Sequence, residues 1–182
     1  MSQISNLGSE VAFGLNGVMN AVLIAFFNLL PADCPAENEF TNQLFISHSS
    51  KDFGWVTENL ISVIEKHSID YSIHNRDFEL GKPIVQNMAD SVYASRRVLI
   101  VLSKNYLASN FCREELHMAA QRELDAEDSS LILVMIQKLK KKQLPTALRK
   151  KHVLDFDKHK KKHDWEEAML REIFDGESST DV

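Results

Sequence analysis

Residues 95–116, SRRVLIVLSKNYLASNFCREEL, contain the pattern that decides the fold class of this chain. The run 98–102, VLIVL, is apolar without interruption and has polar residues on both sides. A run of this kind is typical of a central parallel strand that is covered on both faces. A helix is predicted over 109–124, with Glu114 and Glu115 in its early turns, where acidic side chains favour the helix dipole. The stretch therefore predicts one strand followed by one helix of an α/β domain.

The same alternation of short apolar runs and amphipathic stretches continues along residues 42–174 and indicates repeated strand–helix units. Five strands joined by right-handed crossovers predict a flavodoxin-like, doubly wound, five-stranded parallel sheet of the α/β class. The strands are predicted over 44–47, 70–73, 98–102, 130–136 and 152–156, and the other helices over 53–67, 84–94 and 164–174.

An additional apolar helical segment, residues 1–30, is predicted in front of this domain. Its residues 11–30 carry no formal charge, and twenty such residues are about the length of a helix that crosses a bilayer. Asparagine and glycine residues form a stripe along this helix, which fits a helix packed against protein equally well. Membrane anchor and packing helix therefore both stay open. Residues 31–41 are predicted to be a linker and residues 175–182 a flexible polar tail.

The composition indicates an ordered chain, because 44% of the residues are hydrophobic and 26% are charged. The two cysteines, Cys34 and Cys112, are too few for a disulfide framework. A reducing, cytoplasmic setting is therefore expected, with membrane attachment through residues 11–30 as an addition to it.

Basic residues are distributed unevenly along the chain. Of 21 Lys and Arg residues, 11 fall between Lys138 and Lys162, although the formal net charge is −5. A uniformly basic, nucleic-acid-binding chain is therefore not indicated, and no specific nucleic acid partner is expected. The runs KLKKK and KHKKKH predict a local basic face, which is either solvated or attracts an acidic partner or an anionic lipid.

Motifs of several other doubly wound proteins are missing from the sequence. No GxGxxG and no GxxxxGK[ST] motif occurs, which argues against a dinucleotide fold and a P-loop. The first and third predicted strands end in Ser47 and Ser103, and not in the carboxylates of a phosphate-accepting receiver domain. No metal-ligand spacing surrounds either cysteine, so no metal site is predicted. Function must therefore be argued from other residues.

Three blocks of the sequence, in this order, resemble the Toll/interleukin-1 receptor (TIR) domain family. The first is LFISHSSKD at 44–52, the second is RDFELGKPI at 76–84, and the third is the stretch 95–116. A looser similarity involves Phe156 after the fifth strand and Trp165 at the start of the last helix. The resemblance covers about three-quarters of the chain. It implies intracellular signal transduction of the innate-immune type through homotypic contacts with other TIR domains, as a homo- or hetero-oligomer.

The resemblance implies that the loop 75–83 inserts into a neighbouring TIR domain. Phe78 and Leu80 are apolar residues in this loop, which is costly unless something covers them. The alternative is that Phe78 folds back onto the core of its own domain. Leu80 also stands where the receptor-type pattern usually has Pro. The candidate interaction residues are Arg76, Asp77, Phe78, Leu80, Gly81 and Pro83.

An alternative function that the resemblance implies is hydrolysis of NAD to nicotinamide and ADP-ribose, or a cyclic form of it. Glu115 takes the position of the glutamate that enzymatic TIR domains use to cleave the nicotinamide–ribose bond. A carboxylate there would stabilise an oxocarbenium-like transition state. NAD would be the substrate, no cofactor is required, and the other contacts would be Ser47, His48, Glu79, Gly81 and Lys82.

Several residues make NAD hydrolysis the less favoured of the two hypotheses. Glu115 could equally be a first-turn acid that favours the helix dipole, or a polar surface contact. Enzymatic members tend to have an acidic residue and an aromatic residue at the positions of His74 and Pro83. A nucleotide would therefore lack a charge partner and a stacking surface here. Signalling by TIR–TIR interaction is the preferred hypothesis, and NAD hydrolysis is the second.

Overall fold

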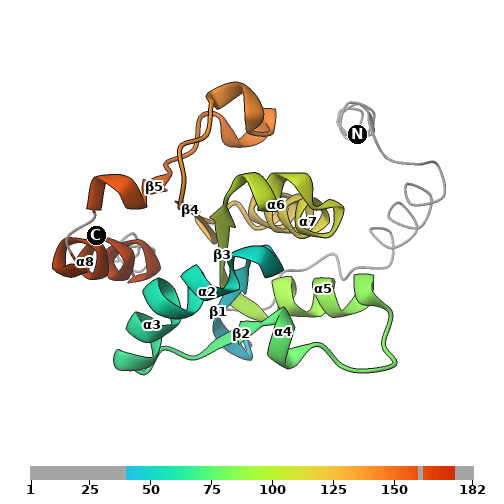
Figure 1. Ribbon diagram of the computed structural model, residues 1–182. Coiled ribbons are helices and arrows are strands. Elements are labelled where there is room, and N and C mark those ends of the chain that lie inside the picture. The colour runs from blue at the N-terminus through green and yellow to red at the C-terminus, as the bar shows by residue number, and fades with distance from the viewer. Residues whose placement is uncertain (1–39, 160–161, 175–182) are drawn as a thin grey trace. The chain divides into compact units, whose positions relative to one another are not determined.

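The predicted central strand lies in the middle of a five-stranded parallel sheet with the order β2-β1-β3-β4-β5 (Figure 1). This computed structural model describes residues 40–159 and 162–174. The strand order is that of flavodoxin-like sheets, so the predicted fold class is confirmed for these residues. The strands are β1 (Asn42–Ser47), β2 (Tyr71–Ile73), β3 (Ser95–Leu102), β4 (Leu131–Met135) and β5 (Leu154–Asp155).

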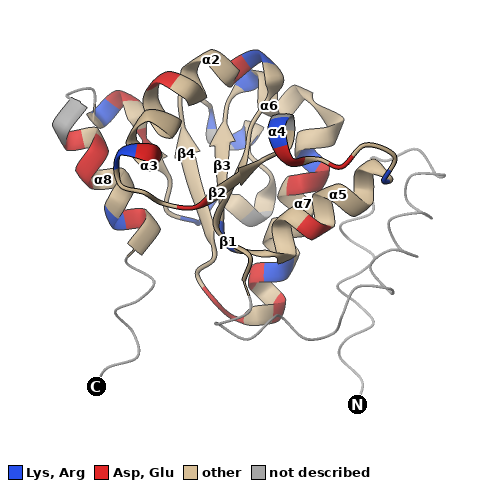
Figure 2. Cartoon of the chain, turned by 90° about the horizontal axis from the view of Figure 1, so that it is seen from below, with Lys and Arg blue, Asp and Glu red and all other residues tan. Residues whose placement is uncertain are grey.

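Helices surround the sheet, and the charged residues lie mainly on these helices and on the loops (Figure 2). The helices are α2 (Phe53–Val56), the π-helical segment η2 (Thr57–Ile61), α3 (Ser62–Lys66), α4 (His74–Asp77), α5 (Ile84–Tyr93), α6 (Lys104–Ala108), α7 (Asn110–Ala126) and α8 (Lys162–Phe174). Short 3-10 turns are η1 (Ser50–Asp52), η3 (Lys141–Gln143), η4 (Thr146–Leu148) and η5 (Phe156–His159).

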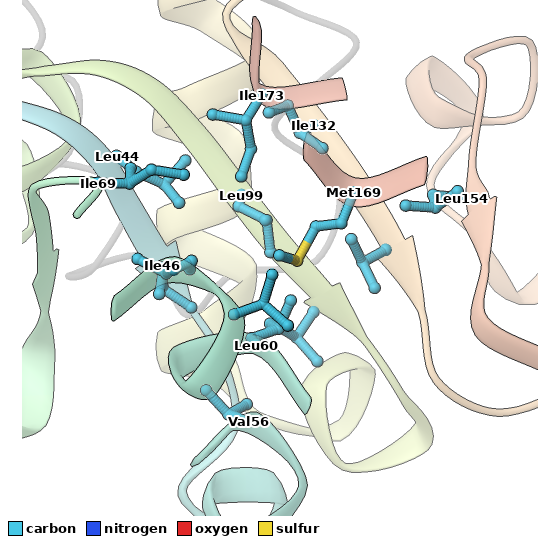
Figure 3. Packing of buried hydrophobic residues seen from close by; sticks show 14 of the residues in the cluster. Leu44, Ile46, Val56, Leu60, Ile69, Leu99, Ile132, Leu154, Met169 and Ile173 are labelled. Carbon is cyan, nitrogen blue, oxygen red and sulfur yellow. The ribbon is translucent and has the colours of Figure 1, made fainter. Parts of the chain in front are cut away.

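The alternation of side chains along β1 decides what each face of the sheet contains. Leu44 and Ile46 belong to one apolar layer, which α2, α3 and α8 cover (Figure 3). Successive side chains of a strand point to opposite faces, so Ser47 points to the other layer, where it contacts Glu115 of α7. The sequence position of Ser47, at the end of a buried strand, therefore places a hydroxyl against a helix.

A buried tryptophan of α8 packs against the apolar layer that this helix covers. Trp165 is buried, packs edge-on against Trp55 and Phe156, and donates its indole N–H to the Asn59 carbonyl at 2.9 Å. Asn59 lies in the π-helical segment η2, which interrupts the helix predicted as continuous over 53–67. The wider turn of a π-helix changes the direction of its carbonyls relative to an α-helix. Packing of α8 against this segment thus uses a polar as well as an apolar contact.

Further differences from the prediction concern two strands and one helix. β3 begins at Ser95 and not at Val98, because main-chain pairing with β1 continues along its polar residues, where Arg97 lies opposite Leu44. The fifth strand has two residues in place of the predicted five. The helix α6 was not predicted, and its N-cap is Ser103, whose hydroxyl accepts from the Tyr106 N–H.

The predicted apolar helix within residues 1–30, most of the linker 31–41 and the tail 175–182 lie outside the described residues. Within residues 40–159 and 162–174, no helix combines the length and the apolar character that crossing a membrane requires.

Candidate functional site

A buried cluster of two hydroxyls and a carboxyl lies at the carboxyl end of β1. The Ser47 hydroxyl donates to the Glu115 carboxyl, and its Oγ lies 2.8 Å from the hydroxyl oxygen of Tyr106. Since Ser47 has one proton to give, Tyr106 is the donor in the second hydrogen bond. The three side chains come from β1, α6 and α7, and all three are fully buried.

The surroundings of Glu115 favour its neutral form. Burial raises the pKa of Glu115 to about 8, and the hydrogen bond from Ser47 opposes this rise only in part. Burial also raises the pKa of Tyr106 well above its usual value and that of Cys112 to about 11. At pH 7 the whole cluster is therefore largely uncharged. The Glu115 Oε1 atom has no hydrogen-bond partner among the residues that the structure describes.

The structure excludes two of the roles considered for Glu115 from the sequence. Glu115 lies in the second turn of α7 and is fully buried, so it is neither a first-turn acid nor a surface contact. The neighbouring Glu114 is also buried, and burial raises its pKa. Neither oxygen of Glu114 has a hydrogen-bond partner in the described part of the chain.

Five aromatic rings from the residues after β1, after β2 and at the start of α7 pack together and are called the aromatic group below. The His48 and His74 rings are stacked with their centroids 4.4 Å apart, and the Phe53 ring lies 5.6 Å from His48. Phe78 and Phe111 lie 5.9 and 5.8 Å from His74 and 6.0 Å from each other. The group thus joins the turn after β1, the segment after β2 and the start of α7.

His48 is a fully buried side chain. Burial, followed by repulsion from His74, lowers the pKa of His48 to about 4, so its ring is neutral at pH 7. Burial also lowers the pKa of His74. Ser47 therefore contacts Glu115, and neither Ser47 nor His48 is exposed to a ligand in this conformation.

A second polar link supports the position of Tyr106. The Asp52 carboxylate accepts from the Ser103 hydroxyl at 2.5 Å and from the Asn105 amide at 2.7 Å. These contacts join the turn after β1 to the start of α6, which presents Tyr106 to Ser47. Sequence reasoning missed Asp52, Asn105 and Tyr106. The available signal was that polar residues directly follow two buried strands, whose carboxyl ends meet at one edge of a parallel sheet.

Hydrogen bonds and an ion pair to α5 hold the loop between β2 and α5. The Asn87 side chain accepts from the Glu79 N–H at 3.0 Å and donates to the Glu79 carbonyl at 3.1 Å. The Lys82 ammonium forms an ion pair with Asp90 at 2.6 Å. Of the predicted ligand contacts, Lys82 is thus bound to α5 through its side chain and Glu79 through its main chain, whereas the Glu79 carboxylate is exposed.

Other polar residues of the loop satisfy its own backbone. Asp77 accepts from the Ile73 N–H at 2.7 Å and forms an ion pair with Arg76 at 2.7 Å. Gly81 has a φ of +88°, a conformation that L side chains rarely adopt. Arg76, Asp77 and Gly81 therefore have local roles that shape the loop.

The apolar residues of the loop divide into two sets. Phe78 is half-buried and packs against His74 and Phe111 of the aromatic group, as in the hypothesis that it folds back onto its own domain. Leu80 is fully exposed, at 104%, and Ile84 is 59% exposed, with the exposed Pro83 between them in sequence. Leu80, Pro83 and Ile84 are called the apolar loop surface below.

The family model for the TIR domain matches residues 44–174, well over half of the chain. The chain therefore belongs to the TIR domain family, and the resemblance drawn from the three sequence blocks is confirmed. Over 134 residues it is 32% identical to Toll-like receptor 6 of Bos taurus, and this match covers 70% of the chain but only 17% of the receptor. The predicted class of function, TIR-mediated signalling of the innate-immune type, agrees with this family and these relatives.

Solved structures agree on the fold. The TIR domain of the Toll-related receptor TRR-2 from Hydra magnipapillata superposes with a TM-score of 0.63 at 20% identity, covering 73% of this chain and 98% of that one. A metazoan TIR-STING receptor from C. gigas, in complex with 2',3'-cGAMP, has a TM-score of 0.60 at 22% identity, covering 74% and 41%. At these identities the two likenesses concern the fold alone.

Proposed function

We propose that this domain transmits a signal by binding other TIR domains through its apolar loop surface. The observation that carries the proposal is the full exposure of Leu80 together with the 59% exposure of Ile84. Each Å² of apolar surface removed from water contributes about 25 cal/mol, so a partner that covers these side chains gains free energy. Pro83 between them adds apolar area without adding conformational freedom.

The shape of the loop supports this proposal. On α5, the Asn87 side chain binds the main chain of Glu79, and the Asp90 carboxylate binds the side chain of Lys82. A loop that is already ordered loses less conformational entropy when it binds, and this increases affinity for a given contact area. Phe78 contributes by packing beneath the loop, so Leu80 is the side chain that a partner would contact first.

The partners in this proposal are other TIR domains, in a homo- or hetero-oligomer, and the setting is the cytoplasm. Attachment to a membrane through residues 11–30 is a separate part of the proposal, supported by the uncharged sequence of that segment. Flotation of the chain with neutral liposomes tests the attachment. Recovery of the protein only in the soluble fraction would contradict it.

Replacing Leu80 by aspartate is expected to weaken self-association at least about tenfold, because a charge would have to be buried in the contact. Leu124→Asp is the matched control, since Leu124 is also exposed, at 66%, but lies on α7. Gly81 is left unchanged because a side chain at its φ of +88° would strain the loop. Light scattering over a concentration series measures the association, and circular dichroism checks the fold. Equal association of Leu80→Asp and Leu124→Asp would contradict the proposal.

The geometry supports NAD hydrolysis less well than protein binding. A hydrolase would bring the Glu115 carboxyl next to a ribose, but this carboxyl is fully buried and largely protonated at pH 7. Ser47 and His48 are buried as well, so access to all three requires movement of the side chains around them. In this conformation the site has the character of a packed interior.

We therefore expect no release of nicotinamide when the purified chain is incubated with NAD, at concentrations where it self-associates. Chromatography of the reaction mixture measures the release directly. Glu115→Gln is the companion variant, because glutamine keeps the acceptor for Ser47 but cannot ionise. Turnover by the wild-type chain that disappears in Glu115→Gln would establish the hydrolase and contradict this expectation.

A further inference from the structure

The connection between β4 and β5 presents a group of exposed basic side chains. β5 pairs only with Val134 and Met135, the last two residues of β4, so the connection leaves and returns at the carboxyl edge of the sheet (Figure 1). No acidic residue occurs in the sequence between Asp128 and Asp155. The exposed basic side chains of this connection, called the basic patch, are Lys138, Lys140, Lys142, Arg149 and Lys150.

The connection that carries the basic patch is anchored to the domain by buried leucines and hydrogen bonds. Leu144 and Leu148 of the connection are buried and anchor it to the domain. The Lys140 N–H donates to the Gln143 side chain at 2.8 Å, and the Arg149 Nε donates to the Leu144 carbonyl at 3.1 Å. The patch therefore has a defined position on the domain.

Lysines of the basic patch differ in their ion pairing from Lys151, the next lysine in the sequence. Lys151 forms an ion pair with the buried Glu123, whose other oxygen accepts from the Leu131 N–H at β4. Among the residues that the structure describes, Lys138, Lys140 and Lys142 form no ion pair. Their charges are therefore available to an external anionic surface, whereas Lys151 has a structural role.

We propose that the basic patch binds the anionic headgroups of a lipid bilayer. Between Lys138 and Lys162 the sequence has 11 basic and two acidic residues, whereas the remainder has 10 basic and 24 acidic residues. An anionic membrane would attract the patch and repel the rest of the chain, which favours a single orientation of the domain. Lysine ammonium groups suit this role, because they attract a charged surface without requiring a fixed hydrogen-bond geometry.

Two features favour a bilayer over a nucleic acid. Residues 137–153 contain no Phe, Tyr or Trp that could stack on bases, and their only arginine is Arg149. The chain also contains the uncharged run 11–30, and stable membrane binding commonly combines an apolar element with a basic one. This inference concerns where the domain acts, and it does not depend on the contacts of the apolar loop surface.

Co-sedimentation of the full chain with vesicles tests the inference. Binding to vesicles with about 30 mol% phosphatidylserine is expected to exceed binding to neutral phosphatidylcholine vesicles at least about tenfold. The excess should decrease as salt is raised from about 0.1 M to about 0.5 M, because the Debye length becomes shorter. Equal binding to the two kinds of vesicle would overturn the proposal, and would assign any membrane affinity to another part of the chain.

The patch variant replaces Lys138, Lys140 and Lys142 by glutamine, and it should lose at least about tenfold of the binding to anionic vesicles. The control variant replaces three exposed basic residues on other helices by glutamine, Lys66, Arg113 and Arg171, so its net charge changes by the same amount. It should bind anionic vesicles within about twofold of wild type. Urea unfolding checks that both variants are folded. Equal losses in the two variants, or tighter binding of wild type to a short duplex DNA than to the vesicles, would overturn the proposal.

Discussion

Replacing Arg122 by methionine is expected to lower the free energy of unfolding by about 3 to 5 kcal/mol. Arg122 is a fully buried arginine of α7. Its Nη1 donates to the carbonyls of Val92, at 2.6 Å, and Ser95, and its Nη2 donates to the carbonyl of Arg96 at 3.0 Å. Methionine fills much of the same volume but donates no hydrogen bond, so three carbonyls would lose a charged donor.

The position of these carbonyls explains why the effect should be large. Val92 lies near the end of α5, and Ser95 begins β3, so the guanidinium joins α7 to the turn that leads into the central strand. The Phe40 ring lies 5.1 Å from the guanidinium carbon and adds a cation–π contact. One side chain thus holds three elements together.

Urea unfolding followed by circular dichroism measures this effect. Arg113→Met is the matched control, because Arg113 is an exposed arginine on the same helix, and its replacement should change stability by no more than about 0.5 kcal/mol. Arg122→Lys should fall between the two, since an ammonium cannot reproduce the planar geometry of a guanidinium. If Arg122→Met unfolds at the urea concentration of the control, the structural role assigned to Arg122 is wrong.

The second large effect concerns pH and Glu115. The pKa of Glu115 is about 8 in the folded chain, whereas an unperturbed glutamate, which represents the unfolded chain, has a pKa of about 4.5. The protonated carboxyl is therefore favoured by folding, and its contribution to stability is complete below pH 4.5 and is lost as the pH rises through 8. From pH 6.5 to 8, the free energy of unfolding should decrease by about 2 kcal/mol.

Glu115→Gln should remove this decrease, because glutamine cannot ionise and still accepts from Ser47. The variant should therefore be more stable than wild type at pH 8 and above. Glu58→Gln is the control, since Glu58 is exposed, and it should follow the wild-type profile. A Glu115→Gln profile parallel to that of wild type would show that the buried carboxyl does not titrate in this range.

The pH range of this experiment begins at 6.5 because buried histidines act in the opposite direction at acid pH. The pKa of His48 is lowered to about 4 and that of His74 is also lowered, so both favour the unfolded chain as the pH falls below 6.5. Burial also raises the pKa of Glu114, in the variant as in wild type. The difference between the two proteins therefore isolates Glu115.

Much of the fold could be predicted from the sequence because its signals are local. The uninterrupted apolar run 98–102 requires cover on both faces, and it became the centre of β3. The fifth strand was predicted too long, because its main-chain pairing with β4 is confined to two positions. The helix α6 was missed because its five residues are too few to show a helical period.

The candidate site was predicted only in part. The family pattern indicated Glu115, Ser47 and His48. The structure joins Ser47 to Glu115 by a hydrogen bond and buries all three residues. Tyr106 was not indicated, because its contact with Ser47 joins residues 59 positions apart in the sequence. Burial of the site was not foreseen either, since polar residues after a strand are usually exposed in the turn.

By itself the sequence determined the class of fold, the family and the uneven distribution of charge, because these depend on residue types and their spacing. Only the tertiary structure decided that Glu115 is a neutral, buried acid, because its pKa depends on the side chains that exclude water from it. Only the tertiary structure separated Phe78 from Leu80, two apolar residues of one loop. Phe78 finds partners on α7 and in the segment after β2, whereas Leu80 has none within the described domain that shields it from water, and this difference makes Leu80 the contact to test.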